Sequence, residues 1–95
     1  MAKFNLDLSL PVSVFREGDA FIAFSPVLDL STSATTFEKA KARFDEVLQI
    51  FFEELIEKGT LDEVLSDLGW QKVKKSWQPP VLISQETENY NFMFA

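Results

Sequence analysis

A long stretch of helical periodicity, residues 36–58, constrains this chain more than any other feature. Apolar side chains recur there at steps of three and four, and residues at that spacing share one face of an α-helix. The members of this apolar stripe are Phe37, Ala40, Phe44, Val47, Leu48, Phe51 and Leu55. A helix so apolar on one side is unstable alone in water, so the rest of the chain must supply the surface that covers it.

The two ends of this stretch carry helix start and stop signals. Thr36 can cap the first turn by itself, while Thr35 and Glu38 have the Thr-x-x-Glu spacing of a capping box. Gly59 supplies the stop, because the residue after a helix often takes a left-handed conformation that glycine adopts without steric cost. The sequence therefore predicts one long helix and leaves open which threonine caps it.

Period-two alternation before the helix predicts a small sheet. Apolar and polar side chains alternate over residues 4–15, which is typical of a strand with one buried and one open face. Pro11 cannot donate to a β-ladder, so this strand should lie at an edge or be bulged there. A turn containing Gly18 follows, and residues 20–24 and 27–31 are predicted as the second and third strands.

The chain after the long helix predicts a second helix and two more strands. Thr60 and Glu63 repeat the capping-box spacing ahead of a short apolar stripe. Residues 70–77 are predicted as a fourth strand, and residues 81–94, which follow two prolines, as a fifth.

These elements predict an α+β fold in the order βββααββ. A small antiparallel-rich β-sheet would carry the long amphipathic helix on one face and the short helix beside it. The 95 residues suit a single domain, residues 1–95, and an apolar content of 46% is typical of a soluble globular chain.

The charge balance and the missing residue types argue against several functions. Lys and Arg number 9 against 15 Asp and Glu, and the net charge of -6 argues against a general nucleic-acid binder. The chain has no Cys and no His, so disulfides, thiolate chemistry and the commonest general base are excluded. We expect no enzyme activity and no cofactor.

Nothing in the sequence predicts a membrane protein. The first residues lack the apolar core of a signal peptide, and the longest mostly apolar run, VLQIFF, is too short to span a bilayer. We therefore expect a cytoplasmic, soluble protein.

The stretch from the first strand to the end of the long helix resembles a known family. It has an acidic glycine turn, an Ala-x-x-Pro-x-Leu segment, and a helix that opens with threonine four residues before alanine. The residues concerned are Gly18, Ala23, Pro26, Leu28, Thr36 and Ala40. Over roughly residues 8–70, the chain is similar to the HicB-like antitoxin domain.

The resemblance implies a partial ribonuclease-H-like fold, a dimer or higher homo-oligomer, and a small basic HicA-like toxin as partner. That toxin would cleave RNA and be held inactive by occlusion. The chain departs from the family at Lys39, where Glu is usual, and at Ala34 and Thr35, which replace Gly-Asp. Family members often carry a DNA-binding segment, whereas residues 70–95 predict strands, so no direct DNA binding is expected.

Asp7 and Asp29 are candidates for a different chemistry. On neighbouring strands they could hold magnesium, as carboxylates do in nucleases of the ribonuclease-H fold. Such clusters usually contain more carboxylates, and no motif places a third one here. We interpret both as surface residues, with a metal-dependent nuclease as an alternative.

The segment WQKVKKSW interleaves lysines with two tryptophans. Lys72, Lys74 and Lys75 lie between Trp70 and Trp77, as in a platform for single-stranded nucleic acid. Lysines also protect edge strands from pairing with other chains. The net charge of -6 favours this second interpretation.

The outer face of the long helix is a candidate for partner binding. Its acidic residues are Glu46, Glu53, Glu54 and Glu57. Ile50 lies among them, and Phe52 and Ile56 widen the apolar side beyond what one sheet should cover. Such a patch could dock a basic partner, although a solvated helix face has a similar pattern.

Tyr90, Phe92 and Phe94 form a second candidate interface. They share one side of the predicted fifth strand. That strand could pair within its own sheet or add to the sheet of a neighbouring chain.

These observations favour a non-enzymatic interaction module that oligomerises and binds or occludes a small basic toxin-like partner. The alternative is a stand-alone oligomeric domain that binds a small ligand in a cleft between helix and sheet edge.

Overall fold

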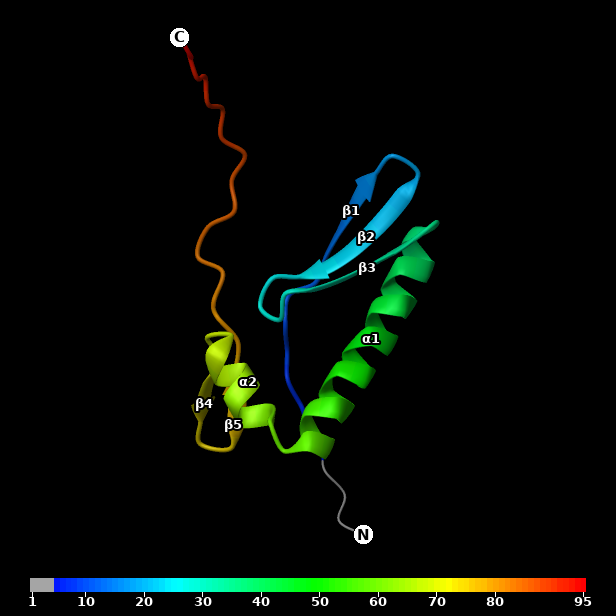
Figure 1. Ribbon diagram of the computed structural model, residues 1–95, viewed down its shortest axis with the longest axis vertical. Helices are drawn as coiled ribbons and strands as arrows, with labels where there is room; N and C mark the ends of the chain where they lie inside the picture. The colour runs from blue at the N-terminus through cyan, green and yellow to red at the C-terminus, as the bar shows by residue number, and fades with distance from the viewer. Residues whose placement is uncertain (1–4) are drawn as a thin grey trace.

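Two antiparallel sheets and two helices make up the computed structural model, which describes residues 5–95 (Figure 1). The elements are β1 (Ser13–Glu17), β2 (Ala20–Ser25), β3 (Leu30–Ala34), α1 (Phe37–Lys58), α2 (Leu61–Asp67), β4 (Gln71–Val73) and β5 (Ser76–Gln78). This order confirms the predicted α+β class and the arrangement βββααββ, although several element bounds differ from the prediction.

α1 begins and ends at residues whose chemistry suits those positions. The Thr36 side chain accepts a hydrogen bond from the backbone N–H of Lys39 at 3.1 Å, so Thr36 supplies the cap. Gly59 has a φ of 69°, and its N–H donates to the carbonyl of Ile56 at 3.2 Å. The predicted helix is confirmed, and the structure decides which threonine caps it.

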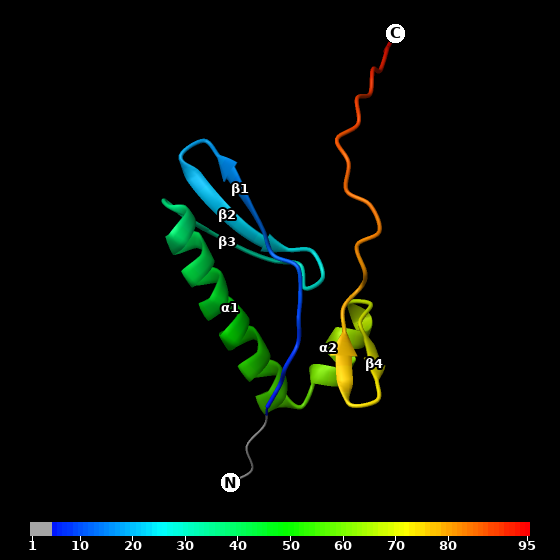
Figure 2. The same cartoon turned by 180° about the vertical axis from the view of Figure 1, so that it is seen from behind.

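The strands β1, β2 and β3 form one sheet in that order, and α1 lies along one side of it (Figure 2). Gly18 has a φ of 60° in the β1–β2 turn, as a tight hairpin requires. Small residues bring the helix close to the sheet: Ala23 of β2 and Ala40 of α1 are 0% exposed. Phe44 and Ala34 complete this first core cluster.

A second core cluster joins α2 and the β4–β5 hairpin to the rest of the domain. Its buried residues are Val27, Leu28, Leu55, Leu61, Leu65, Trp70 and Trp77. The indole Nε1–H of Trp70 donates to the carbonyl of Val27 at 2.8 Å, across 43 positions of sequence. This buried bond ties the start of the hairpin to the β2–β3 turn, so the second cluster connects the smaller sheet to the larger one.

The predicted first strand, residues 4–15, is wrong in extent. Residue 4 lies outside the described residues, residues 5–12 are extended without ladder pairing, and β1 begins only at Ser13. The alternation still holds as burial, since Leu6, Leu8 and Leu10 are partly buried while the residues between them are exposed. Pro11 explains the break, because it has no N–H for a ladder.

The predicted third strand, residues 27–31, is shifted by three positions. β3 starts at Leu30, and Val27 and Leu28 are buried in the turn before it. Asp29 makes this turn possible with a φ of 54°, a left-handed conformation that aspartate tolerates better than most residues.

The predicted fourth strand, residues 70–77, is in fact a hairpin of β4 and β5. Lys74 lies at its turn with a φ of 60°. The segment lacks the Gly, Asn or Asp that usually marks such a turn, so no local residue pattern predicts it.

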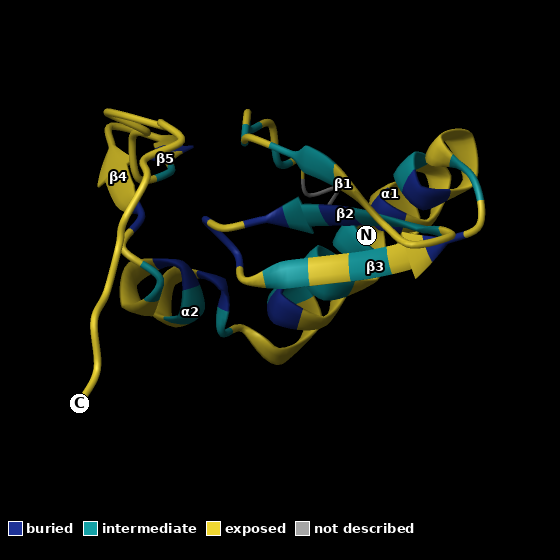
Figure 3. Ribbon diagram, turned by 90° about the horizontal axis from the view of Figure 1, so that it is seen from above, coloured by how far each residue is buried: buried dark blue, intermediate teal, exposed yellow. Residues whose placement is uncertain are grey.

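The predicted fifth strand, residues 81–94, is not a strand. The chain over residues 81–95 is extended, unpaired and exposed (Figure 3). Its alternation of aromatic and polar residues is real, but the described residues offer it no neighbouring strand with which to pair.

The capping assignment can be tested with a pair of matched substitutions. We expect Thr36→Ala to lower the free energy of unfolding by about 1 kcal/mol, because the Lys39 N–H loses its acceptor. Thr35→Ala should change it by less than about 0.5 kcal/mol. Urea unfolding followed by circular dichroism measures both, and equal losses would contradict the assignment.

The Trp70–Val27 bond can be tested in the same way. We expect Trp70→Phe to cost about 2 kcal/mol, because a buried carbonyl loses its donor as well as some packing. Trp77→Phe removes an indole from the same cluster but leaves that bond in place, so it should cost clearly less in the same measurement. A larger loss of unfolding free energy in Trp77→Phe than in Trp70→Phe would contradict the importance of the bond.

Candidate functional site

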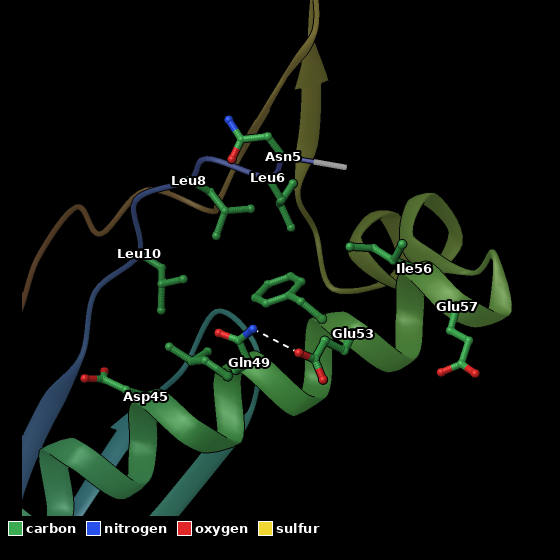
Figure 4. A pocket seen from close by; sticks show the side chains of 11 residues that line it. Asn5, Leu6, Leu8, Leu10, Asp45, Gln49, Glu53, Ile56 and Glu57 are labelled. Atoms are coloured by element: carbon green, nitrogen blue, oxygen red, sulfur yellow. Dashed lines mark hydrogen bonds between the residues drawn. The ribbon is translucent and has the colours of Figure 1, made fainter. Parts of the chain in front are cut away.

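A groove about 880 Å³ in volume runs between α1 and the extended segment 5–10 (Figure 4). Its apolar lining consists of Leu6, Leu8, Leu10, Leu48, Phe52 and Ile56. Its polar lining consists of Asn5, Asp45, Gln49, Glu53 and Glu57. We call this surface the acidic groove, because three carboxylates and no Lys or Arg line it among the described residues.

The helix wall of the acidic groove follows from two neighbouring rows of α1. Leu48, Phe52 and Ile56 are spaced by four residues and form an apolar row. Asp45, Gln49, Glu53 and Glu57 have the same spacing and form a polar row beside it. Residues four apart lie one above the other on a helix, so an apolar floor and an acidic rim run in parallel along α1.

The opposite wall follows from the alternation in the extended segment. Leu6, Leu8 and Leu10 all project toward α1 in Figure 4, as alternate residues of an extended chain do. They are partly buried against the core, while Asp7 and Ser9 between them are exposed. One unpaired strand covers this part of the helix and leaves the groove open.

The rim of the groove keeps most of its charge in solvent. Asp45, Glu53 and Glu57 are exposed, and Glu53 Oε1 accepts a hydrogen bond from Nε2 of Gln49 at 2.9 Å. Apolar surface flanked by exposed carboxylates suits a ligand with both apolar and cationic groups.

The structure divides the predicted helix-face residues between two surfaces. Phe52 and Ile56 line the acidic groove together with Glu53 and Glu57. Ile50, in contrast, is 59% exposed and does not line it. Glu46 and Glu54 are exposed and also lie outside the groove lining.

The other wall of the groove does not follow from the sequence pattern. The alternation over residues 4–15 predicts Leu6, Leu8 and Leu10 on the buried face of a paired strand. The two rows on α1 were the available signal, since Asp45 and Gln49 continue the spacing of Glu53 and Glu57. Periodicity does not predict that these two rows lie opposite an unpaired extended segment.

Asp7 and Asp29 lie on two segments of the chain that form no common strand pair. Asp7 is exposed on the extended segment, and Asp29 is exposed in the β2–β3 turn and not in a strand as predicted. Among residues 5–95, no group of three or more His, Cys, Asp or Glu side chains is placed to hold a metal ion.

The two tryptophans of the lysine-rich segment are not available for stacking on bases. Trp70 is 3% and Trp77 is 9% exposed, because both belong to the core. Lys72 lies with Nζ 5.7 Å from the centre of the Trp77 ring and 3.8 Å from Asp62 Oδ2. The lysines therefore border a folded hairpin and present no open aromatic platform.

A second depression, about 710 Å³ in volume, lies on the other side of the extended segment. Its charged lining mixes Asp7 and Asp62 with Lys72 and Lys75. Its charges offset one another locally, so it lacks the one-sided charge of the acidic groove.

Tyr90, Phe92 and Phe94 project from the extended chain after β5. They are 68%, 70% and 90% exposed, and the Tyr90 and Phe92 rings stack with centroids 6.1 Å apart. Their exposure leaves the predicted interface role open.

Comparisons with known protein families, with curated proteins and with solved structures find no match for this chain. Among residues 5–95, no helix is both long enough and apolar enough to cross a membrane.

The unpaired state of the groove's outer wall has a measurable consequence. We expect the amide hydrogens of residues 5–10 to exchange with solvent far faster than those of α1, because no ladder protects them. Amide exchange followed by nuclear magnetic resonance measures this, with β2 as the protected control. Equal protection in residues 5–10 and β2 would show that the segment is paired in solution.

Proposed function

We propose that this chain is a non-enzymatic interaction module that binds a small basic protein in the acidic groove. The observation that carries the proposal is the pairing of an apolar floor with a rim of three carboxylates, to which residues 5–95 add no Lys or Arg. The net charge of -6 would also speed the approach of a basic partner.

The proposal extends to the kind of partner through the resemblance to the HicB-like antitoxin domain. The residues that carry it take structural roles here: Gly18 turns the first hairpin, Ala23 and Ala40 pack between sheet and helix, and Thr36 caps α1. If the chain acts as members of that family do, its partner is a small basic HicA-like toxin whose RNA-cleaving surface is occluded on binding.

The shape of the groove favours a particular element of the partner. α1 supplies one apolar row just over two turns long, and an amphipathic helix presents a matching row at the same spacing. Lysine or arginine on the flanks of that helix would face Asp45, Glu53 and Glu57. An amphipathic basic helix is therefore the segment we expect to occupy the groove.

A synthetic helical peptide of leucine and lysine with a single apolar face tests this binding directly. We expect saturable binding by isothermal titration calorimetry, weakened by added salt because exposed charges are screened. Glu53→Lys should weaken binding at least about tenfold, since one charge reversal near a rim contact removes an attraction and adds a repulsion.

Glu54→Lys is the matched control. It makes the same charge change on the same helix at an exposed residue outside the groove lining, so it should have a much smaller effect. Equal loss in both variants would show that only net charge matters and would overturn the groove as the site.

Co-purification from the native host tests the identity of the partner. We expect one small basic protein at fixed stoichiometry with the unmodified chain, retained by Glu54→Lys and lost from Glu53→Lys. Recovery of the chain alone would contradict the antitoxin-like role, whereas peptide binding in the groove would still stand.

A further inference from the structure

The chain after β5 forms an arm, residues 81–95, that lies on the opposite side of the sheet from α1 (Figures 1 and 2). Every residue of the arm is exposed, and no ladder pairs it with the body. Its large apolar residues are Val81, Leu82, Ile83, Tyr90, Phe92, Met93 and Phe94, all at least 65% exposed. Exposed apolar surface of this extent usually marks a site that is buried against another surface.

The open face of the sheet carries three large apolar residues among polar ones such as Ser31 and Ser33. Phe15 of β1 pairs with Ile22 of β2, and both alternate with the residues that face α1. Phe24 lies on the same open face beside Ser13. Phe15 is 55% exposed, so α1 and α2 leave this face uncovered.

A groove about 380 Å³ in volume lies where the root of the arm passes this open face. Its lining from the body is Pro11, Ser13, Phe15, Phe24, Pro26 and Val27, and Val81, Leu82 and Gln85 line it from the arm. We call it the sheet groove. No charged residue of the described part of the chain lines it, and its volume lies in the range of about 300–1,000 Å³ that suits buried ligand groups.

Charge decides which groove can receive the tip of an arm. Glu86 and Glu88 precede the aromatic residues, and the Tyr90 hydroxyl donates to Glu88 Oε2 at 3.0 Å. The acidic groove would repel this segment through Asp45, Glu53 and Glu57. The uncharged sheet groove would accept its aromatic rings without that repulsion.

The direction of the arm favours the sheet groove of another molecule. Residues 81–85 of the arm line its own sheet groove, and the chain beyond them is extended. No residue of the arm has a positive φ that would turn the chain back toward that groove. At about 3.3 Å per residue, its aromatic tip reaches roughly 30 Å beyond that root. Two copies related by a two-fold axis could therefore each place the tip in the other's sheet groove.

We propose that two copies of this chain exchange arms, so that Tyr90, Phe92 and Phe94 of each copy pack in the sheet groove of the other. Three aromatic side chains can bury about 150–250 Å² each, so two arms and their two receiving surfaces would bury roughly 1,800–3,000 Å² if fully covered. That area is large enough for a stable, specific interface, which buries about 1,200–2,000 Å². The exchange is independent of partner binding in the acidic groove.

Sedimentation velocity over a concentration series tests the exchange. We expect the unmodified chain to dimerise, and replacement of Tyr90, Phe92 and Phe94 together by serine to raise the dimer Kd at least about a hundredfold, because interface aromatics contribute strongly. Met93→Ser is the matched control: Met93 is 91% exposed but points to the other side of the extended arm, so its effect should be small.

Disulfide trapping tests the geometry, and the absence of native cysteine removes any background. We expect a Phe15→Cys chain mixed with a Phe92→Cys chain to give a covalent heterodimer under mild oxidation. Ile50→Cys, at a residue as exposed as Phe15 but on α1, should not cross-link with Phe92→Cys.

Three outcomes would overturn the proposal. The unmodified chain could remain monomeric at its highest soluble concentration. A chain carrying both Phe15→Cys and Phe92→Cys could close on itself in preference to joining a second copy. Phe92→Cys could also cross-link equally well to Ile50→Cys. Circular dichroism should show unchanged folding in the arm variants, because the arm residues contribute nothing to either core cluster.

Discussion

The structure depends on the covering of one apolar helix face by a sheet that is shorter than the helix. α1 has 22 residues, and at about 1.5 Å per residue it is roughly 33 Å long. The strands packed against it have 5 or 6 residues, and at about 3.3 Å per residue they span roughly 16–20 Å. The sheet therefore covers only part of the helix, and other segments must cover the rest.

Different segments cover the remainder to different degrees. α2 and the β4–β5 hairpin bury Leu55 in the second core cluster, secured by the Trp70–Val27 hydrogen bond. The row of Leu48, Phe52 and Ile56 packs only partly against the core clusters, and the unpaired segment 5–10 lies opposite it across the acidic groove. The acidic groove is thus a direct result of the length mismatch, because a single strand cannot close a surface that a paired sheet would cover.

The acidic groove and the sheet groove differ in charge, so they suit different partners. The acidic groove combines apolar side chains with a rim of carboxylates, which suits a basic amphipathic ligand. The sheet groove is uncharged and lies beside an arm rich in aromatic residues. Binding of a basic partner and assembly with a second copy would use opposite sides of the sheet, so one need not block the other.

The sequence by itself determined the elements whose signals are local. Helical periodicity and end signals predicted α1, and alternation with a glycine turn predicted the β1–β2 hairpin. Periodicity also found Phe52, Ile56, Glu53 and Glu57, because helical spacing alone places them on neighbouring rows.

Only the tertiary structure decided which alternating segments are paired strands. Residues 4–15 and 81–94 alternate as strands do, yet hydrogen-bonded pairing depends on a neighbour that periodicity does not reveal. Turns at Asp29 and Lys74 were hidden because non-glycine residues adopt left-handed conformations there. The groove, the open sheet face and the free arm all arise from distant segments meeting or failing to meet, which no local pattern encodes.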